Sequence, residues 1–195
     1  MAPTRSAARE LEEALARATA SHSTLGTDVV QNAADIIKAH LKAGSSNASD
    51  EVSDLLRCLR EIPGTDNASI RVDALIDGAH FFFVTGQPYL SIEPARSAVV
   101  LAKQANLRPL QRKALTVFGV MSADTGNIAQ AVEAYSDALE LAEFLDDRQA
   151  KVVVWVNLGV ALFNCAQYRD AVMCFETAIQ LSEGRSELSA FRISA

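Results

Sequence analysis

The sequence predicts an all-α fold built from antiparallel helix pairs, on two grounds. The first is composition: 49% of the 195 residues are hydrophobic and 22% are charged, whereas Gly and Pro contribute only 9 and 5 residues. Such a chain can bury a core and is poor in residues that interrupt helices. The second is an internal repeat with a spacing of 40 residues. The positions in register are Trp155, Leu115 and Leu75; Gly159, Gly119 and Ala79; Ala166, Gly126 and Gly86; Phe175, Tyr135 and Ala95; Ala178, Ala138 and Ala98; and Leu181, Leu141 and Leu101.

Within the last copy, small residues alternate with large ones on two helices joined by a tight turn. The residues are Trp155, Leu158, Gly159, Ala171, Phe175 and Ala178. This pattern resembles the tetratricopeptide repeat, whose first helix carries a Trp, a Leu and a Gly and whose second carries Ala and Phe. The resemblance implies a right-handed superhelical solenoid that acts as a protein-binding scaffold and not as an enzyme. The usual period is about 34 residues, so the longer spacing is similar to that of long-period arrays in bacterial signalling and regulatory proteins.

Residues 1–27 are expected to form an N-terminal cap helix and a turn, because Leu11, Leu15 and Ala18 make a narrow apolar stripe. Residues 28–64 predict a helical pair that lacks the signature residues and is interpreted as a degenerate first repeat. Asp28 is the expected cap of its first helix, and Ser49 or Asp50 that of its second.

Three repeats are expected to follow, at residues 65–107, 108–146 and 147–185. Gly126 is the expected terminator of one helix, and Asn127 is the expected cap of the next. Asp146 or Asp147 is expected to cap the last repeat, with helices at 148–165 and 169–182.

The last residues, 186–195, predict the start of a further helix. Leu188, Phe191 and Ile193 fall where the first helix of another repeat would begin. Each unit of a solenoid covers only its neighbour's apolar side, so a terminal element with a polar outer face is needed. We therefore expect this segment to be truncated and the chain to be the N-terminal part of a longer protein.

Charge and composition argue against several classes of function. The formal net charge is −6 and Lys and Arg are not clustered, which disfavours nucleic-acid binding. No apolar run is long enough for a membrane span, and the first 20 residues contain Glu10, Glu12 and Glu13 in place of a signal core. A cytoplasmic protein is expected. Neither the three cysteines nor the histidines have metal-ligand spacing, and no Gly-rich phosphate loop occurs, so no metal or cofactor is expected.

The resemblance implies that the first helices of the pairs line a concave groove. The groove positions are Ile76, His80, Phe83, Thr116, Val120, Val156, Val160 and Phe163. Because these side chains are mostly apolar, they predict a protein ligand, a peptide or a helix, bound by apolar burial. Only Lys113 and Asn157 match the carboxylate clamp that some family members use for acidic peptides, so such a ligand is not expected. The apolar run 152–156 also allows two other interpretations: neighbouring helices cover it, or a small apolar ligand does.

Single features of the sequence also allow two other classes of function. A homodimer would use uncapped C-terminal side chains, namely Phe175, Leu188, Phe191 and Ile193. An enzyme would use His80, which Asp77 is placed to orient at i and i+3. Catalysis also needs a nucleophile or a second base, and the sequence specifies neither. The sequence therefore favours an interaction module.

Overall fold

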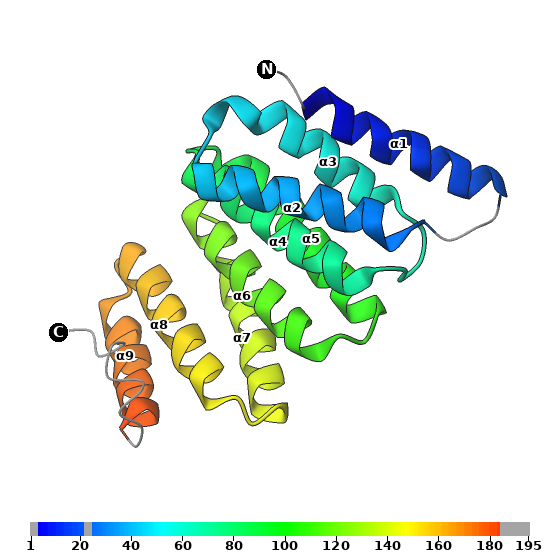
Figure 1. The fold of residues 1–195 in the computed structure, drawn as a ribbon. Helices are drawn as coiled ribbons and strands as arrows, with labels where there is room; N and C mark the ends of the chain where they lie inside the picture. The colour runs from blue at the N-terminus through cyan, green and yellow to red at the C-terminus, as the bar shows by residue number, and fades with distance from the viewer. Residues whose placement is uncertain (1–3, 22–24, 184–195) are drawn as a thin grey trace. The chain divides into compact units, whose positions relative to one another are not determined.

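A computed structural model describes residues 4–21 and 25–183, and all regular structure in these two ranges is helical (Figure 1). The elements in order are α1 (Thr4–Ser21), α2 (Thr27–Ala43), a 3₁₀ turn (Ser46–Ala48), α3 (Ser49–Glu61), α4 (Ala68–Val84), α5 (Pro88–Gln104), α6 (Arg108–Asp124), α7 (Ile128–Phe144), α8 (Arg148–Asn164) and α9 (Tyr168–Ser182). The predicted all-α fold of antiparallel helix pairs is confirmed.

The chain divides into two compact units, Met1–Ala114 and Leu115–Ala195, which we call the first unit and the second unit. In the first unit, α4 and α5 pack closely as an antiparallel pair. Helix α2 lies along α4, and α3 packs mainly on α1 (Figure 1). Helices α2 and α3 contact each other less than they contact these other neighbours. Adjacency in sequence therefore does not make them a tightly packed pair.

The first unit has an apolar core to which each of its helices contributes. Five of its large side chains are each at most 1% exposed, namely Leu11, Ile37, Leu56, Leu75 and Phe81. The amphipathic spacing that predicted these helices is the cause, since one apolar face of each helix is turned inward. The expected cap at Asp28 is wrong, because α2 begins at Thr27 and Gly26 precedes it without a side-chain cap.

The turns within the pairs repeat at the same spacing as the sequence. Gly86, Gly126 and Ala166 have φ angles of 77°, 81° and 60°, in the left-handed region. In each turn the next residue donates its backbone N–H to a carbonyl five residues earlier, as in Gln167 N to Leu162 O at 2.9 Å. This is the bonding of a Schellman motif, which ends a helix and reverses the chain.

In the second unit, α8 and α9 form a close pair and α7 packs against α8. Trp155 packs against two small clusters of buried side chains, one around Val152 and Ala178 and the other around Leu162. Two expected caps are confirmed: the Asn127 side chain accepts from Gln130 N at 3.4 Å, and that of Asp147 accepts from Ala150 N at 2.9 Å. Because both clusters contain residues of α8 and of α9, the packing of Trp155 against them helps to join the two helices of the last pair.

Candidate functional site

The side chains predicted to line a groove differ greatly in exposure. Ile76 is 0% exposed, whereas Val160 and Phe163 are 44% and 55% exposed. Phe83 is at 36%, and the remaining positions are half-buried: His80, Thr116, Val120 and Val156. Helix α2 packs along α4, the helix that carries Ile76, so this position belongs to the core of the first unit. The two most exposed of these apolar positions, Val160 and Phe163, lie on α8, whereas Phe83 lies near the end of α4.

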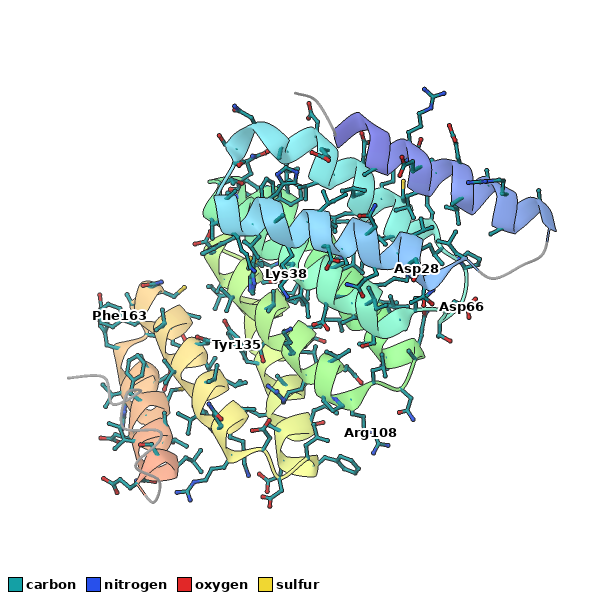
Figure 2. The ribbon with its side chains drawn as sticks, viewed as in Figure 1. Asp28, Lys38, Asp66, Arg108, Tyr135 and Phe163 are labelled. Carbon is teal, nitrogen blue, oxygen red and sulfur yellow. The ribbon has the colours of Figure 1, made fainter. Side chains whose placement is uncertain are left out.

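An apolar surface runs along α8 and onto the start of α9. Val156, Val160 and Phe163 are four and three residues apart, so they lie on one face of the helix. The ring of Phe163 meets that of Tyr168 edge to face, with centroids 5.3 Å apart. Figure 2 shows Phe163 at the end of α8. We call these four residues, Val156, Val160, Phe163 and Tyr168, the α8 strip.

The polar neighbours of Val160 on α8 carry no charge. Asn157 lies three residues before Val160, and Asn164 lies four residues after it, so both are its neighbours on the helix surface. Both side chains are uncharged amides. The side chains of Tyr168 and Phe163 are 58% and 55% exposed. Exposed apolar surface of this kind is typical of an interaction site, and its contact energy must come mainly from apolar burial.

In the first unit, a charged hollow of about 380 Å³ lies along α2 and α4. Its wall includes Asp35, Lys38, Asp73, Asp77 and Lys113, and Figure 2 labels Lys38 on α2. Lys113 Nζ lies 2.7 Å from Asp73 Oδ1. Lys113, the basic residue at a clamp position, is therefore held by an aspartate. None of the side chains predicted to line the groove is among those that line this hollow.

The candidate catalytic residue His80 lies half-buried on α4. Burial lowers the pKa of its imidazole, while the charge of Asp77 acts in the opposite direction. Burial raises the pKa of the Asp77 carboxyl, against the charges of Lys113 and Lys38. The two residues therefore influence each other electrostatically, as their spacing predicted. Burial and the interaction with Asp77 explain the environment of His80 and do not assign it a catalytic role.

The residues proposed for a dimer contact fall into two groups. Phe175 is half-buried and packs against the cluster around Leu162 within the α8–α9 pair. Leu188, Phe191 and Ile193 lie outside the described residues. Phe175 therefore has a packing role inside the pair.

Sequence reasoning missed a second cavity in the first unit, of about 290 Å³, between the end of α3 and helices α4 and α5. Its most buried charged residue is Arg71, which is 3% exposed. A signal was present, because Arg71 is the one basic residue in segment 68–79, whose other residues are apolar or acidic except for Ser69.

Comparison with known proteins bears on the last helix pair. Residues 152–185 match the family model of the tetratricopeptide repeat. The match covers most of α8 and all of α9, and with them the α8 strip. No curated protein matches the chain. None of the described helices is long and apolar enough to cross a membrane.

The fold and the match together define the class of protein. It is an all-α helical-repeat protein with a tetratricopeptide repeat at its last described pair. Helical repeats of this kind present extended surfaces to other proteins and are in general not enzymes.

Proposed function

We propose that the protein is an interaction module whose α8 strip binds an amphipathic helix or peptide of a partner protein. The observation that carries this proposal is the exposure of Val160 and Phe163, at 44% and 55%, within the residues that match the repeat family. A partner that places apolar side chains at helical spacing along the strip would remove both from water.

The chemistry of the strip selects for shape and apolar area. Each Å² of apolar surface removed from water contributes roughly 25 cal/mol, from which the costs of association are subtracted. Since the polar neighbours of Val160 on α8, Asn157 and Asn164, are uncharged amides, charge pairing contributes little. We therefore expect moderate affinity that is weakly sensitive to salt, in contrast to electrostatic docking.

The wider setting of this proposal is regulatory. The spacing of 40 residues is similar to that of long-period repeats in bacterial signalling proteins, so we place the module in the cytoplasm as part of a scaffold or sensor. Its three cysteines, none of them in a disulfide among the described residues, agree with a reducing compartment.

Selection of a displayed random peptide library against the chain tests the proposal. We expect the selected peptides to carry apolar residues three and four positions apart, and fluorescence anisotropy to measure their affinity. Val160→Glu places a charge in the contact and should weaken binding by about tenfold or more. Val132→Glu is the matched control, because Val132 is 38% exposed on α7. Equal binding by both variants and the original chain would rule out the strip.

A second candidate function is self-association, favoured by the exposure of Val172 and Met173 on α9, at 53% and 59%. In this proposal the α9 surface and the C-terminal residues Phe175, Leu188, Phe191 and Ile193 meet a second copy. Light scattering over a range of concentrations should give twice the chain mass of 20.9 kDa, and Phe191→Glu should return it to the single-chain value. A constant single-chain mass would exclude the dimer.

A further inference from the structure

We propose that the cavity between α3, α4 and α5 binds an apolar carboxylate, a ligand class that neither the repeat match nor the α8 strip implies. We call this cavity the arginine pocket. Its basic wall is formed by Arg60, Arg71 and Arg96, and its apolar wall includes Ile62, Val100 and Leu101. All these residues belong to the first unit.

The volume of the arginine pocket, about 290 Å³, is near the lower end of the range for small-molecule sites. The pocket therefore suits a ligand of the size of a single amino acid. Its wall combines aliphatic side chains with guanidinium groups, a combination that calls for a ligand with both an apolar body and a negative head.

Arg71 gives the pocket a buried positive charge. Its side chain donates four hydrogen bonds to backbone carbonyls, from Nε to Leu59 at 2.9 Å, from Nη1 to Gly64 and Asp66 at 3.1 and 3.2 Å, and from Nη2 to Ile62 at 2.8 Å. A guanidinium has five N–H groups, so one on Nη2 is left over.

No carboxylate of the described residues forms an ion pair with Arg71. The charge of Asp66 acts on it, but burial dominates and lowers the pKa of the guanidinium. Buried charges in proteins are generally paired. Carbonyl dipoles and the charge of Asp66, which forms no ion pair with it, compensate Arg71 within the described structure, so an anionic ligand would supply a directly paired partner.

The rim of the arginine pocket adds further positive charge. Arg60 Nη1 lies 3.2 Å from Glu93 Oε1, in a pair whose side chains are 32% and 62% exposed. Exposed pairs of this kind are weak and exchange readily. With Arg96, the wall holds three cations against one acid, in a chain whose net charge is −6. This local excess favours an anion.

A carboxylate fits these groups better than a bare inorganic anion does. Its two oxygens match the fork of a guanidinium, and an attached aliphatic group would cover Val100 and Leu101. Two sources share this chemistry: the carboxyl-terminal residue of a polypeptide with an apolar side chain, and a short free aliphatic acid.

Titration of the ¹⁵N-labelled full chain, followed by amide chemical shifts, tests the proposal with three probes. These are N-acetyl-leucine, hexanoate, and the neutral N-acetyl-leucinamide as a matched control. We expect an acid to shift the signals of residues around Val100, and the amide to bind about tenfold more weakly, since a charge-assisted hydrogen bond is lost. Tighter binding of N-acetyl-leucine identifies a polypeptide terminus, and tighter or equal binding of hexanoate identifies a free acid. Equal binding of the amide, or no binding of either acid, would overturn the proposal.

A pair of variants locates the site. Arg71 is unsuitable for replacement because it also holds the carbonyls at the end of α3. Val100→Glu introduces a negative charge at the pocket and should abolish acid binding. Val84→Glu, at a valine of α4 that is 59% exposed and does not line the pocket, should bind as the original chain does. Unchanged binding in Val100→Glu would place the ligand elsewhere and refute the assignment.

Discussion

Gly159 lies against the ring of Phe175 so closely that a Cβ on the glycine would be 2.6 Å from Cε1 of the ring. The same relationship joins Gly119 to Tyr135, where the distance from a Cβ to Cε1 would be 2.5 Å. In both pairs the glycine of the first helix and the aromatic residue of the second are 16 positions apart. The absence of a side chain at the glycine is therefore what allows an aromatic ring between the helices.

Replacement of Gly159 by Ala tests this packing. A methyl group placed 2.6 Å from the ring must displace it, and overpacking of this kind costs about 1–3 kcal/mol. Part of that cost is offset, because Ala favours a helix by about 1 kcal/mol over Gly. We expect a net loss of up to about 2 kcal/mol in the free energy of unfolding of the second unit. Urea unfolding followed by the fluorescence of Trp155, the chain's one tryptophan, measures it.

A double-mutant cycle supplies the control for this prediction. The equivalent positions two copies earlier are Ala79 and Ala95, both 0% exposed, which shows that two alanines can occupy them. Gly159→Ala combined with Phe175→Ala should therefore lose less stability than the two single changes added together, by about 0.5–3 kcal/mol for residues in contact. Strictly additive losses would mean that the glycine and the ring are independent.

Ala166 gives a prediction of the opposite sign. Its φ of 60° lies in the left-handed region, where the equivalent turns have Gly86 and Gly126. A residue with a Cβ pays about 1–2 kcal/mol in this conformation, whereas Gly loses about 0.5–1 kcal/mol more in backbone entropy. Ala166→Gly is therefore expected to raise the stability of the second unit by about 0.5–1 kcal/mol. The urea midpoint by Trp155 fluorescence measures the change.

The reverse substitution is the matched control for Ala166. Gly126→Ala places a Cβ at a φ of 81° and should lower stability by about 1 kcal/mol. Lower stability in Ala166→Gly would mean that the methyl group makes a contact worth more than the strain.

Much of the fold is visible in the sequence because its causes are local. The alternation of small and large residues at a spacing of 40 predicts the helices of the last pair to within one residue, at Arg148–Asn164 and Tyr168–Ser182. Caps at Asn127 and Asp147 are likewise set by short-range hydrogen bonds. Such features depend on residues that are close in the chain.

The candidate sites are less predictable because they depend on neighbours that are distant in sequence. Ile76 and Val156 occupy equivalent positions, yet Ile76 is 0% exposed, since α2 packs along the helix that carries it. Arg71 is conspicuous in the sequence of α4. Its four carbonyl partners, however, come from the end of α3 and the following turn. No pattern within α4 specifies them.

The attachment of α1 to α3 rests partly on Glu12, and this gives a prediction that depends on pH. Arg57 Nη2 donates to Glu12 Oε1 at 2.6 Å, and Cys58 Sγ lies 3.8 Å from the same oxygen. The hydrogen bond from Arg57 lowers the pKa of the Glu12 carboxyl. Burial raises the pKa of the Cys58 thiol to about 11. Cys58 is 0% exposed, so a thiol reagent reaches it only when α1 opens.

Glu12→Gln is therefore expected to speed the labelling of Cys58 by a thiol reagent at neutral pH, because it removes the charge that Arg57 holds. Cys165 is exposed and should react first in both proteins, while buried Cys174 in the second unit should keep its rate and serve as the internal control. An unchanged rate at Cys58 would mean that apolar contacts such as that of Leu11 hold α1 alone.

The sign of the pH dependence follows from the lowered pKa of Glu12. The contribution of its carboxylate is fully present above the ordinary pKa of a glutamate, about 4.3, and is lost as the pH falls through the lower value of the folded state. Backbone amide hydrogen exchange of residues 7–18 should therefore be faster at acid pH than at neutral pH, once both rates are corrected for the intrinsic pH dependence of exchange. In Glu12→Gln the exchange should already be fast at neutral pH and gain less in acid. Equal acid sensitivity in the two proteins would assign the effect to another carboxylate.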